Sequence, residues 1–202
     1  MLDHLVFGCP DLAAGVEQVQ ALTGVRPVPG GQHVGRGTAN YLLGLGGGAY
    51  LEIVGPDPNQ PGHTGPRPFD VAELDAARLV TWAIRTDDVD QAIAAARTAG
   101  HDPGEPAEMS RQTPDGRLLR WRLTPASADG LVPFLIDWGT SVHPSQRGLP
   151  EVLMISMRAT HPEPAATWVP LSALSADLEV RIGNRIGLTA LLAGRQGEFE
   201  LT

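Results

Sequence analysis

The sequence predicts an α+β fold made of two successive βαβββ modules and a shorter C-terminal unit. Three observations support this prediction: apolar strand-like segments alternate with helix-like ones, one order of segments occurs twice, and a third group of strand-like segments follows. The 202 residues are enough for one large domain or for two small modules that share a sheet. We expect βαβββ modules at residues 1–56 and 79–140 and a partial βαββ module at 149–202, all within one compact structural unit.

The first module begins with an apolar, β-rich segment, Leu2 to Gly8, which ends before Pro10. Asp11 is a good N-cap for the next segment, where apolar residues recur at helical spacing as far as Gly24. Three strand-like segments separated by glycine-rich turns complete the βαβββ order. They are Val25 to Val28, Ala39 to Leu45 and Ala49 to Val54.

The second module repeats this order. A strand-like segment at 79–85 is followed by a helix that Asp88 caps and Gly100 ends. Alignment of Asp11 with Asp88 gives an internal offset of 77 residues, and such a repeat decides the fold more than a single motif does. Strand-like segments follow at 105–112, 117–124 and 131–138.

The remaining segments connect and extend the two modules. Residues 56–68 are rich in proline and glycine, so we expect an exposed loop there. The segment from Glu151 contains strand-like pieces and a short helix around 167–174, and we interpret it as a cap on the repeat.

Composition excludes several classes of function. The formal net charge is −8 and no cluster of basic residues occurs, so we expect neither nucleic acid nor an anionic membrane as partner. All 15 basic residues are arginines, and without lysine the chain has neither a Schiff-base amine nor a P-loop. One cysteine cannot form an intrachain disulfide, and no signal or membrane segment is recognisable. We therefore expect a soluble cytoplasmic protein, and the high glycine and proline content suggests a GC-rich bacterial source.

The segments LDHLVFGCPDLAAGVEQVQALTG and GGQHVGRGTANYLLGLGGGAYLEIVG resemble glyoxalase-like proteins of the vicinal-oxygen-chelate superfamily, which includes glyoxalases, bleomycin-resistance proteins and extradiol dioxygenases. The resemblance covers about the first 140 residues and is strongest in residues 2–54. It implies that each module forms an incomplete barrel and that the two enclose a cavity. It also implies a divalent metal (Mn, Fe, Ni or Zn) held by the first and last strand of each module, and possible assembly as a homodimer.

Carried over to this chain, the resemblance gives His4, Glu52 and Asp137 as metal ligands. The 77-residue offset places Thr81 where the fourth ligand is expected. Alternate residues of a strand face opposite sides, and this independent test also points His4, Glu52 and Asp137 into the cavity. A histidine with two carboxylates is a recognised set for a divalent metal. The alternative is that His4 and Glu52 only hydrogen-bond each other beside a pocket for an organic molecule.

Further residues are candidates for substrate binding or proton transfer. Glu52 or His33 is the proton-transfer candidate. His33 and Asn40 belong to a glycine-rich hairpin, so they either line the pocket or are ordinary turn residues. The other substrate-binding candidates are Tyr50, Arg85, Arg120 and Arg122, of which the arginines are either carboxylate-binding residues or solvated strand residues.

The predicted function is that of a metal-dependent lyase, isomerase or dioxygenase acting on a small oxygenated organic substrate. One alternative is a metal-free protein that binds or sequesters a small molecule, as bleomycin-resistance proteins do. Another is a structural protein whose cavity is filled by side chains. No nucleotide cofactor is expected, because no helix follows the glycine run at 30–37.

Overall fold

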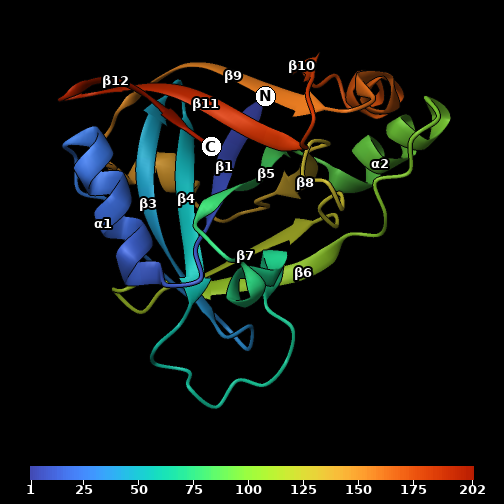
Figure 1. Cartoon of the computed structure of the whole chain (residues 1–202). Coiled ribbons are helices and arrows are strands. Elements are labelled where there is room, and N and C mark those ends of the chain that lie inside the picture. Colours follow the sequence, from blue (N-terminus) through green and yellow to red (C-terminus); the bar gives the residue numbers. More distant parts are fainter.

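Eight strands form a closed barrel in the computed structural model, which describes residues 1–202 (Figure 1). Around the barrel the strands follow the order β1-β4-β3-β2-β6-β7-β8-β5, so each module supplies one half of the wall. The predicted α+β fold with two βαβββ modules is confirmed. The strands are β1 (Leu2–Gly8), β2 (Val28–His33), β3 (Thr38–Gly46), β4 (Ala49–Pro56), β5 (Arg78–Arg85), β6 (Ala107–Gln112), β7 (Leu118–Leu123) and β8 (Phe134–Asp137).

One helix from each module packs outside the barrel. Helix α1 (Leu12–Thr23) begins at Asp11, whose Oδ1 accepts a hydrogen bond from the Ala14 amide at 3.0 Å. It ends at Gly24, whose φ of 67° a residue with a side chain rarely adopts. Helix α2 (Val89–Thr98) begins in the same way at Asp88. Both predicted N-caps are therefore present, and neither these nor any other helix is long and apolar enough to cross a membrane.

Strand β2 lies later in the sequence than predicted. It runs from Val28 to His33 rather than from Val25 to Val28, because the strand contains the two glycines that suggested a turn. Gly31 has a φ of 138° at an irregularity in the β2–β3 pairing, where glycine permits a bulge. His33 consequently ends a strand of the barrel instead of lying in a turn.

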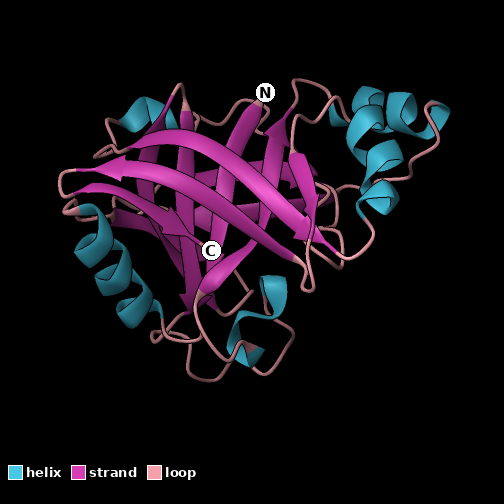
Figure 2. Ribbon diagram, turned by 45° about the horizontal axis from the view of Figure 1, so that its top comes forward, coloured by secondary structure: helices cyan, strands magenta, loops and turns pink.

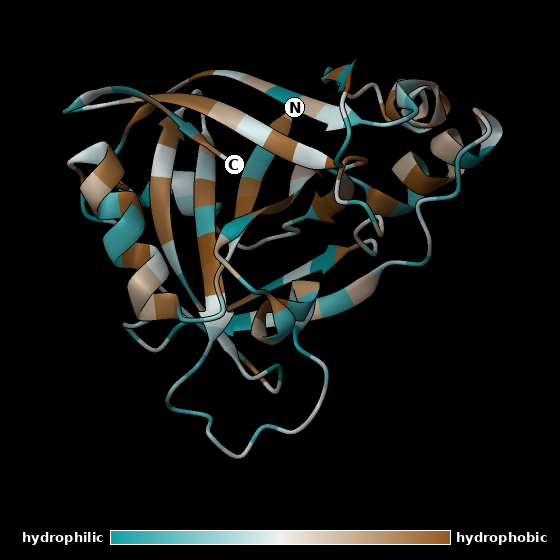
Figure 3. Ribbon diagram, viewed as in Figure 1, coloured by the Kyte–Doolittle hydropathy of each residue, from teal (hydrophilic) through white to brown (hydrophobic).

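The barrel has one apolar core outside its wall and another inside, as the alternation along its strands requires (Figure 3). On β1, Leu5 and Phe7 face the helices, while Val6 faces the interior. On β4, Leu51 and Ile53 face the helices in the same way. His4 and Glu52 occupy interior positions on these two strands, so they face the same enclosed space.

A second sheet, in the order β10-β9-β11-β12, covers the barrel wall (Figure 2). Its buried residues, such as Leu188 and Leu192, share the outer core with Leu5 and Phe7 of the barrel. This C-terminal unit has one strand more than the predicted βαββ module. Its first strand pairs with its second and third, whereas the first strand of each barrel module pairs with the last. The elements are β9 (Leu153–His161), α3 (Trp168–Ala173), β10 (Glu179–Ile182), β11 (Gly187–Gly194) and β12 (Gly197–Leu201), and three short 3-10 helices complete the chain: η1 (Pro68–Glu73), η2 (Pro144–Arg147) and η3 (Pro164–Thr167).

Candidate active site

The interior of the barrel contains a cavity of about 980 Å³. Its wall includes residues from both modules, from the connection that contains η1, and from β11 of the C-terminal sheet. Half of the lining is apolar, and three of the polar side chains, His4, His33 and Asn40, lie around Glu52. A cavity of this size is large enough for a small organic molecule.

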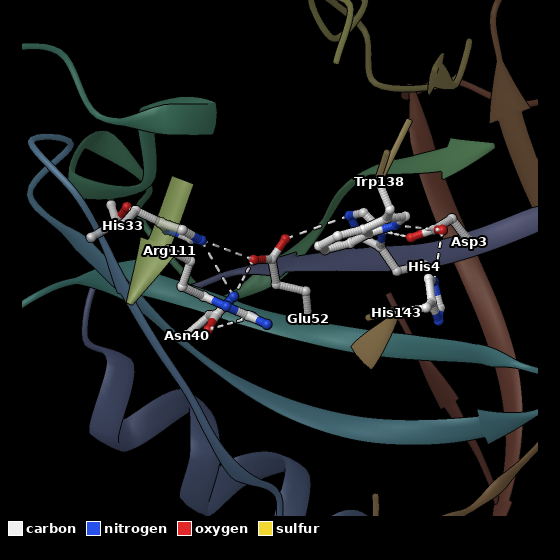
Figure 4. A network of polar contacts seen from close by, with 9 residues as sticks. Asp3, His4, His33, Asn40, Glu52, Arg111, Trp138 and His143 are labelled. Atoms are coloured by element: carbon white, nitrogen blue, oxygen red, sulfur yellow. Dashed lines mark hydrogen bonds and ion pairs between the residues drawn. The ribbon is translucent and has the colours of Figure 1, made fainter. Parts of the chain in front are cut away.

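The carboxylate of Glu52 lies between two histidines that come from neighbouring parts of the wall (Figure 4). His4 Nε2 is 3.6 Å from Glu52 Oε2, and His33 Nε2 is 3.5 Å from Glu52 Oε1. Asn40 Nδ2 donates a hydrogen bond to Glu52 Oε1 at 2.5 Å. All four side chains are buried, so the carboxylate has a fixed position at the inner surface of the cavity.

A buried aspartate orients His4. Asp3 accepts hydrogen bonds from His4 Nδ1 at 2.6 Å, from Trp138 Nε1 at 3.1 Å and from His143 Nε2 at 2.9 Å. Burial raises the pKa of Asp3, but the hydrogen bonds from His143 and His4 outweigh it and hold this pKa well below its usual range. Asp3 is therefore an ionised acceptor, so His4 Nδ1 carries a proton and Nε2 is the ring nitrogen that faces Glu52.

His33, Asn40 and Arg111 form the other end of this polar chain. His33 and Arg111 are direct partners across the β2–β6 pairing, where the two halves of the barrel meet. Arg111 Nη1 donates to Asn40 Oδ1 at 3.1 Å, and His33 Nδ1 is 2.9 Å from Thr38 Oγ1. Burial lowers the pKa of His33 to about 4, and the nearby Glu52, which raises it, offsets only part of this effect. His33 is thus neutral at pH 7.

Tyr50 packs against His4 on the cavity wall, with ring centroids 4.8 Å apart and an interplanar angle of 17°. Burial raises the pKa of Tyr50 well above its usual value, and the charges of Asp3 and Glu52 add to this effect. Its phenol therefore stays protonated. The structure brings Tyr50 together with four other predicted site residues: His4, His33, Asn40 and Glu52.

A family model described as a glyoxalase-like domain matches residues 2–176. The chain belongs to this glyoxalase-like family. The predicted resemblance to glyoxalase-like proteins is thereby confirmed. Comparison with curated proteins gives no match.

Solved structures show a similar fold at low sequence identity. A hypothetical protein from Staphylococcus aureus has a TM-score of 0.66 and 16% identity, over 98% of this chain and 84% of that chain. Methylmalonyl-CoA epimerase from Mycobacterium tuberculosis has a TM-score of 0.44 and 19% identity, over 67% and 86% of the two chains. The epimerase from Streptomyces coelicolor, in complex with 2-nitronate-propionyl-CoA, has a TM-score of 0.47 and 20% identity, over 71% and 98%. At such identities the likeness concerns the fold alone.

The predicted metal ligands of this glyoxalase-like protein do not come together. Asp137 lies outside the cavity, contrary to the prediction, because β8 turns the apolar side chains of Phe134, Ile136 and Trp138 inward. The Asp137 carboxylate accepts hydrogen bonds from the amides of Gly139 at 2.8 Å and Val89 at 3.4 Å, next to the start of α2. No group of three or more His, Cys, Asp and Glu side chains is placed to hold a metal ion.

Strand register explains which residues of the second module replace metal ligands. In the first module, β1 and β4 pair with Val6 opposite Glu52. In the second module, β5 and β8 pair with Ala83 opposite Phe134. If Thr81 corresponds to His4, Ala83 corresponds to Val6 and Phe134 to Glu52. A threonine and a phenylalanine therefore occupy the second pair of ligand positions, and these residues do not fit a four-ligand metal site.

Three predicted substrate-binding arginines also lie away from the cavity. Arg120 and Arg122 are on the outer face of β7, because Leu119, Trp121 and Leu123 take the inner face. Arg122 forms an ion pair with Asp90 at 2.7 Å. Arg85 Nη2 contacts the Met1 sulfur near the protein surface.

Asp3, Arg111 and His143 belong to the site but were not predicted from the sequence. Asp3 and His4 are adjacent, so strict alternation would separate them, but an irregularity in the β1–β5 pairing between Leu2 and His4 lets their side chains meet. His143 comes from the loop before η2 and is buried there beside Asp3. Arg111 lies on the same face of β6 as Met109, which also lines the cavity, but no sequence signal marked that face as the inner one.

Proposed function

We propose that this glyoxalase-like protein is an enzyme that moves a proton to and from a small oxygenated organic substrate. Glu52 is the acid–base group in this proposal. The observation that carries it is the position of the Glu52 carboxylate in the cavity, between His4 Nε2 and His33 Nε2. A carboxylate fixed beside a second proton acceptor is suited to general acid–base catalysis.

The reaction begins when Glu52 takes a proton from a carbon next to a substrate carbonyl. The electrons of the broken C–H bond form an enolate, and the proton now lies on the carboxyl group of Glu52. Asn40 holds one carboxylate oxygen in place. Glu52 then returns the proton to the same carbon, or passes it to His4 Nε2, which delivers it to that carbon and whose imidazolium form Asp3 would stabilise. This is chemistry of the isomerase type.

The metal-dependent form of the predicted function is not part of this proposal. His4 and Glu52 remain side by side, but the second module offers Thr81 and Phe134 at the corresponding positions. Every step above therefore uses only the side chains of this chain.

Deuterium exchange tests the proposal. The protein is incubated in D₂O with a panel of small oxo acids, ketones and aldehydes, and loss of the α-proton is followed by ¹H NMR. We expect exchange with some members of the panel, and a fall of about 100-fold or more in Glu52→Gln, as for loss of a general base. The matched control is Glu105→Gln, because Glu105 is exposed and pairs with Arg97 far from the site. Equal exchange rates in the wild type and in Glu52→Gln would refute the role of Glu52.

A second candidate is a binding protein that sequesters a small molecule without converting it. The observation that favours it is the loss of half of the ligand positions together with retention of a cavity of about 980 Å³. Saturable binding of a panel compound by calorimetry, without exchange or consumption over a day, would support this candidate over the enzyme.

A further inference from the structure

Arg111 is a buried cation that no carboxylate contacts directly, and Asn40 separates it from Glu52. Its side chain is 2% exposed, and its hydrogen bond within the chain goes to the neutral amide oxygen of Asn40. No carboxylate lies within ion-pair distance of the guanidinium, and Arg111 Nε has no hydrogen-bond partner. Buried charges are normally paired, because an unpaired one loses its hydration without compensation. The cavity beside Arg111 is where an anion can supply that compensation.

Two further buried polar groups of the cavity wall lack partners. They are the indole Nε1 of Trp121, which can only donate, and the hydroxyl of Thr81. Strand β7 places Trp121 two residues after Leu119, the direct partner of Arg111, so Arg111 and Trp121 are diagonal neighbours on the inner face. The Trp121 ring also lies against His33, with centroids 6.3 Å apart. Arg111 and Trp121 thus line one region of the cavity as neighbours, and each has a buried N–H group without a partner in the protein.

Thr81 presents its hydroxyl from another side of the cavity. It pairs with Val6 of β1, which in turn pairs with Glu52 of β4, so Thr81 and Glu52 lie in one row across three strands. A ligand that reaches from Arg111 past Glu52 toward Thr81 would meet a donor at each end. The apolar part of the wall, with Met109, Phe134 and other side chains, suits a hydrocarbon body.

From these groups we infer that the cavity recognises a small monoanionic carboxylic acid with an apolar body and an oxygen function on the carbon next to the carboxylate. The carboxylate pairs with Arg111 and accepts from Trp121 Nε1. In a 2-oxo acid this directs C3, the carbon beside the oxo group that carries the acidic proton, toward Glu52. A planar carboxylate matches the fork of one guanidinium, whereas a phosphate dianion usually gathers more than one cation. The position of the reacting carbon rests on the function proposed above, but recognition of the carboxylate does not.

Binding measurements test the inference. The probes are phenylpyruvate and 2-oxohexanoate, their methyl esters, and phenyl phosphate, each titrated by calorimetry or ligand-observed NMR. We expect both acids to bind saturably and the esters, which keep the shape but not the charge, to bind at least ~10-fold more weakly, as for loss of a charge-assisted hydrogen bond. Phenyl phosphate should bind more weakly than phenylpyruvate.

Three variants test which side chains bind the carboxylate of the ligand. Arg111→Gln should weaken binding of the acids by at least ~30-fold and leave the esters unchanged, as for removal of one partner of a buried charge pair. Arg120→Gln removes one positive charge from the outer face of the same barrel and should leave acid binding unchanged. Trp121→Phe removes the indole N–H together with part of the ring, and should weaken the acids about 5-fold more than the esters, in the range of one hydrogen bond. If Arg111→Gln destabilises the fold and lowers the melting temperature, Trp121→Phe still tests the carboxylate site.

Equal affinity of acids and esters would overturn the inference, as would tighter binding of phenyl phosphate or no binding by either acid. Wild-type affinity for the acids in both Arg111→Gln and Trp121→Phe would also overturn it. Glu52→Gln separates this inference from the proposed function. If the acids bind through Arg111 but show no exchange that depends on Glu52, the proposed enzyme is refuted and the carboxylate site is upheld. If the esters exchange as fast as the acids and this exchange depends on Glu52, the proposed enzyme is upheld and the carboxylate site is refuted.

Discussion

The buried, neutral state of His33 predicts that the protein loses stability as the pH falls from 7 to 4. Burial holds the pKa of His33 at about 4 in the folded chain, against about 6.5 for an exposed histidine in the unfolded chain. Between these values the unfolded chain binds a proton that the folded chain does not. Protonation therefore favours unfolding, and the stability that is fully present above pH 6.5 is lost as the pH falls through this window.

The size of the effect follows from the two pKa values. A difference of one unit corresponds to about 1.4 kcal/mol, so the shift of His33 contributes about 3 kcal/mol in total. Linkage places about 2 kcal/mol of this loss between pH 7 and pH 5, and most of the rest between pH 5 and pH 4. The burial of the ring is its main cause, with the charge of the cross-strand neighbour Arg111 adding to it.

The assay is urea unfolding of the wild type and of His33→Gln at half-unit steps from pH 7.5 to pH 4. Glutamine keeps a polar group near Asn40 but does not titrate. Between pH 7.5 and pH 4, we expect the unfolding free energy of the wild type to fall by about 3 kcal/mol more than that of His33→Gln. NMR titration of the His33 ring gives the folded pKa directly. Parallel pH curves for the two proteins, or a His33 pKa near 6.5, would refute the reasoning.

Three other substitutions test the positioning of the site. Asp3→Asn should lower the unfolding free energy at pH 7 by about 3–5 kcal/mol, because a buried charge with three donors is lost. The deficit should narrow as the pH falls below about 4, since the lowered pKa of Asp3 contributes stability only above the usual Asp value, and urea unfolding at several pH values checks both points. Gly30→Ala puts a methyl group against Asn40 Oδ1 and Arg111 Nη1, so acid binding measured by calorimetry should weaken ~10-fold or more while circular dichroism stays unchanged. Asp137→Ala should cost about 1 kcal/mol of unfolding free energy at the start of α2 and leave proton exchange at the wild-type rate. Loss of exchange in this last variant would show that Asp137 belongs to the active site after all.

Local physical chemistry made most of the fold predictable. The aspartate caps at Asp11 and Asp88 mark both barrel helices, since a carboxylate at this position satisfies amides that the helix leaves free. Alternation on β1 and β4 correctly turned His4 and Glu52 inward, because the helix-facing residues of these strands are all apolar. Both signals lie within a few residues of the position they predict.

The errors occurred where the answer depends on register between distant segments. On β8 the inner and outer faces are both apolar, so alternation did not say which face meets the cavity, and Asp137 was assigned to the wrong side. The 77-residue offset that relates His4 to Thr81 does not relate Glu52 to Phe134, because the second module is longer between its first and last strands than the first module is. Arg111 joins the site only through the pairing of β6 with β2, which no local pattern of the sequence specifies.

The two halves of the barrel are alike in topology but differ in the chemistry that they place inside it. The first half supplies the groups able to move a proton, with Glu52 between His4 and His33. The second half supplies Arg111 and Trp121, whose free N–H groups suit an anion. Thr81 and Phe134 stand at the positions that correspond to His4 and Glu52, so the second half offers no matching ligands for a symmetric metal site. In our proposal the substrate lies across the seam between the halves. If that is so, acid binding and proton exchange should be separable by mutation, with Arg111→Gln raising KM for the acid far more than it lowers kcat, and Glu52→Gln lowering kcat at nearly constant affinity.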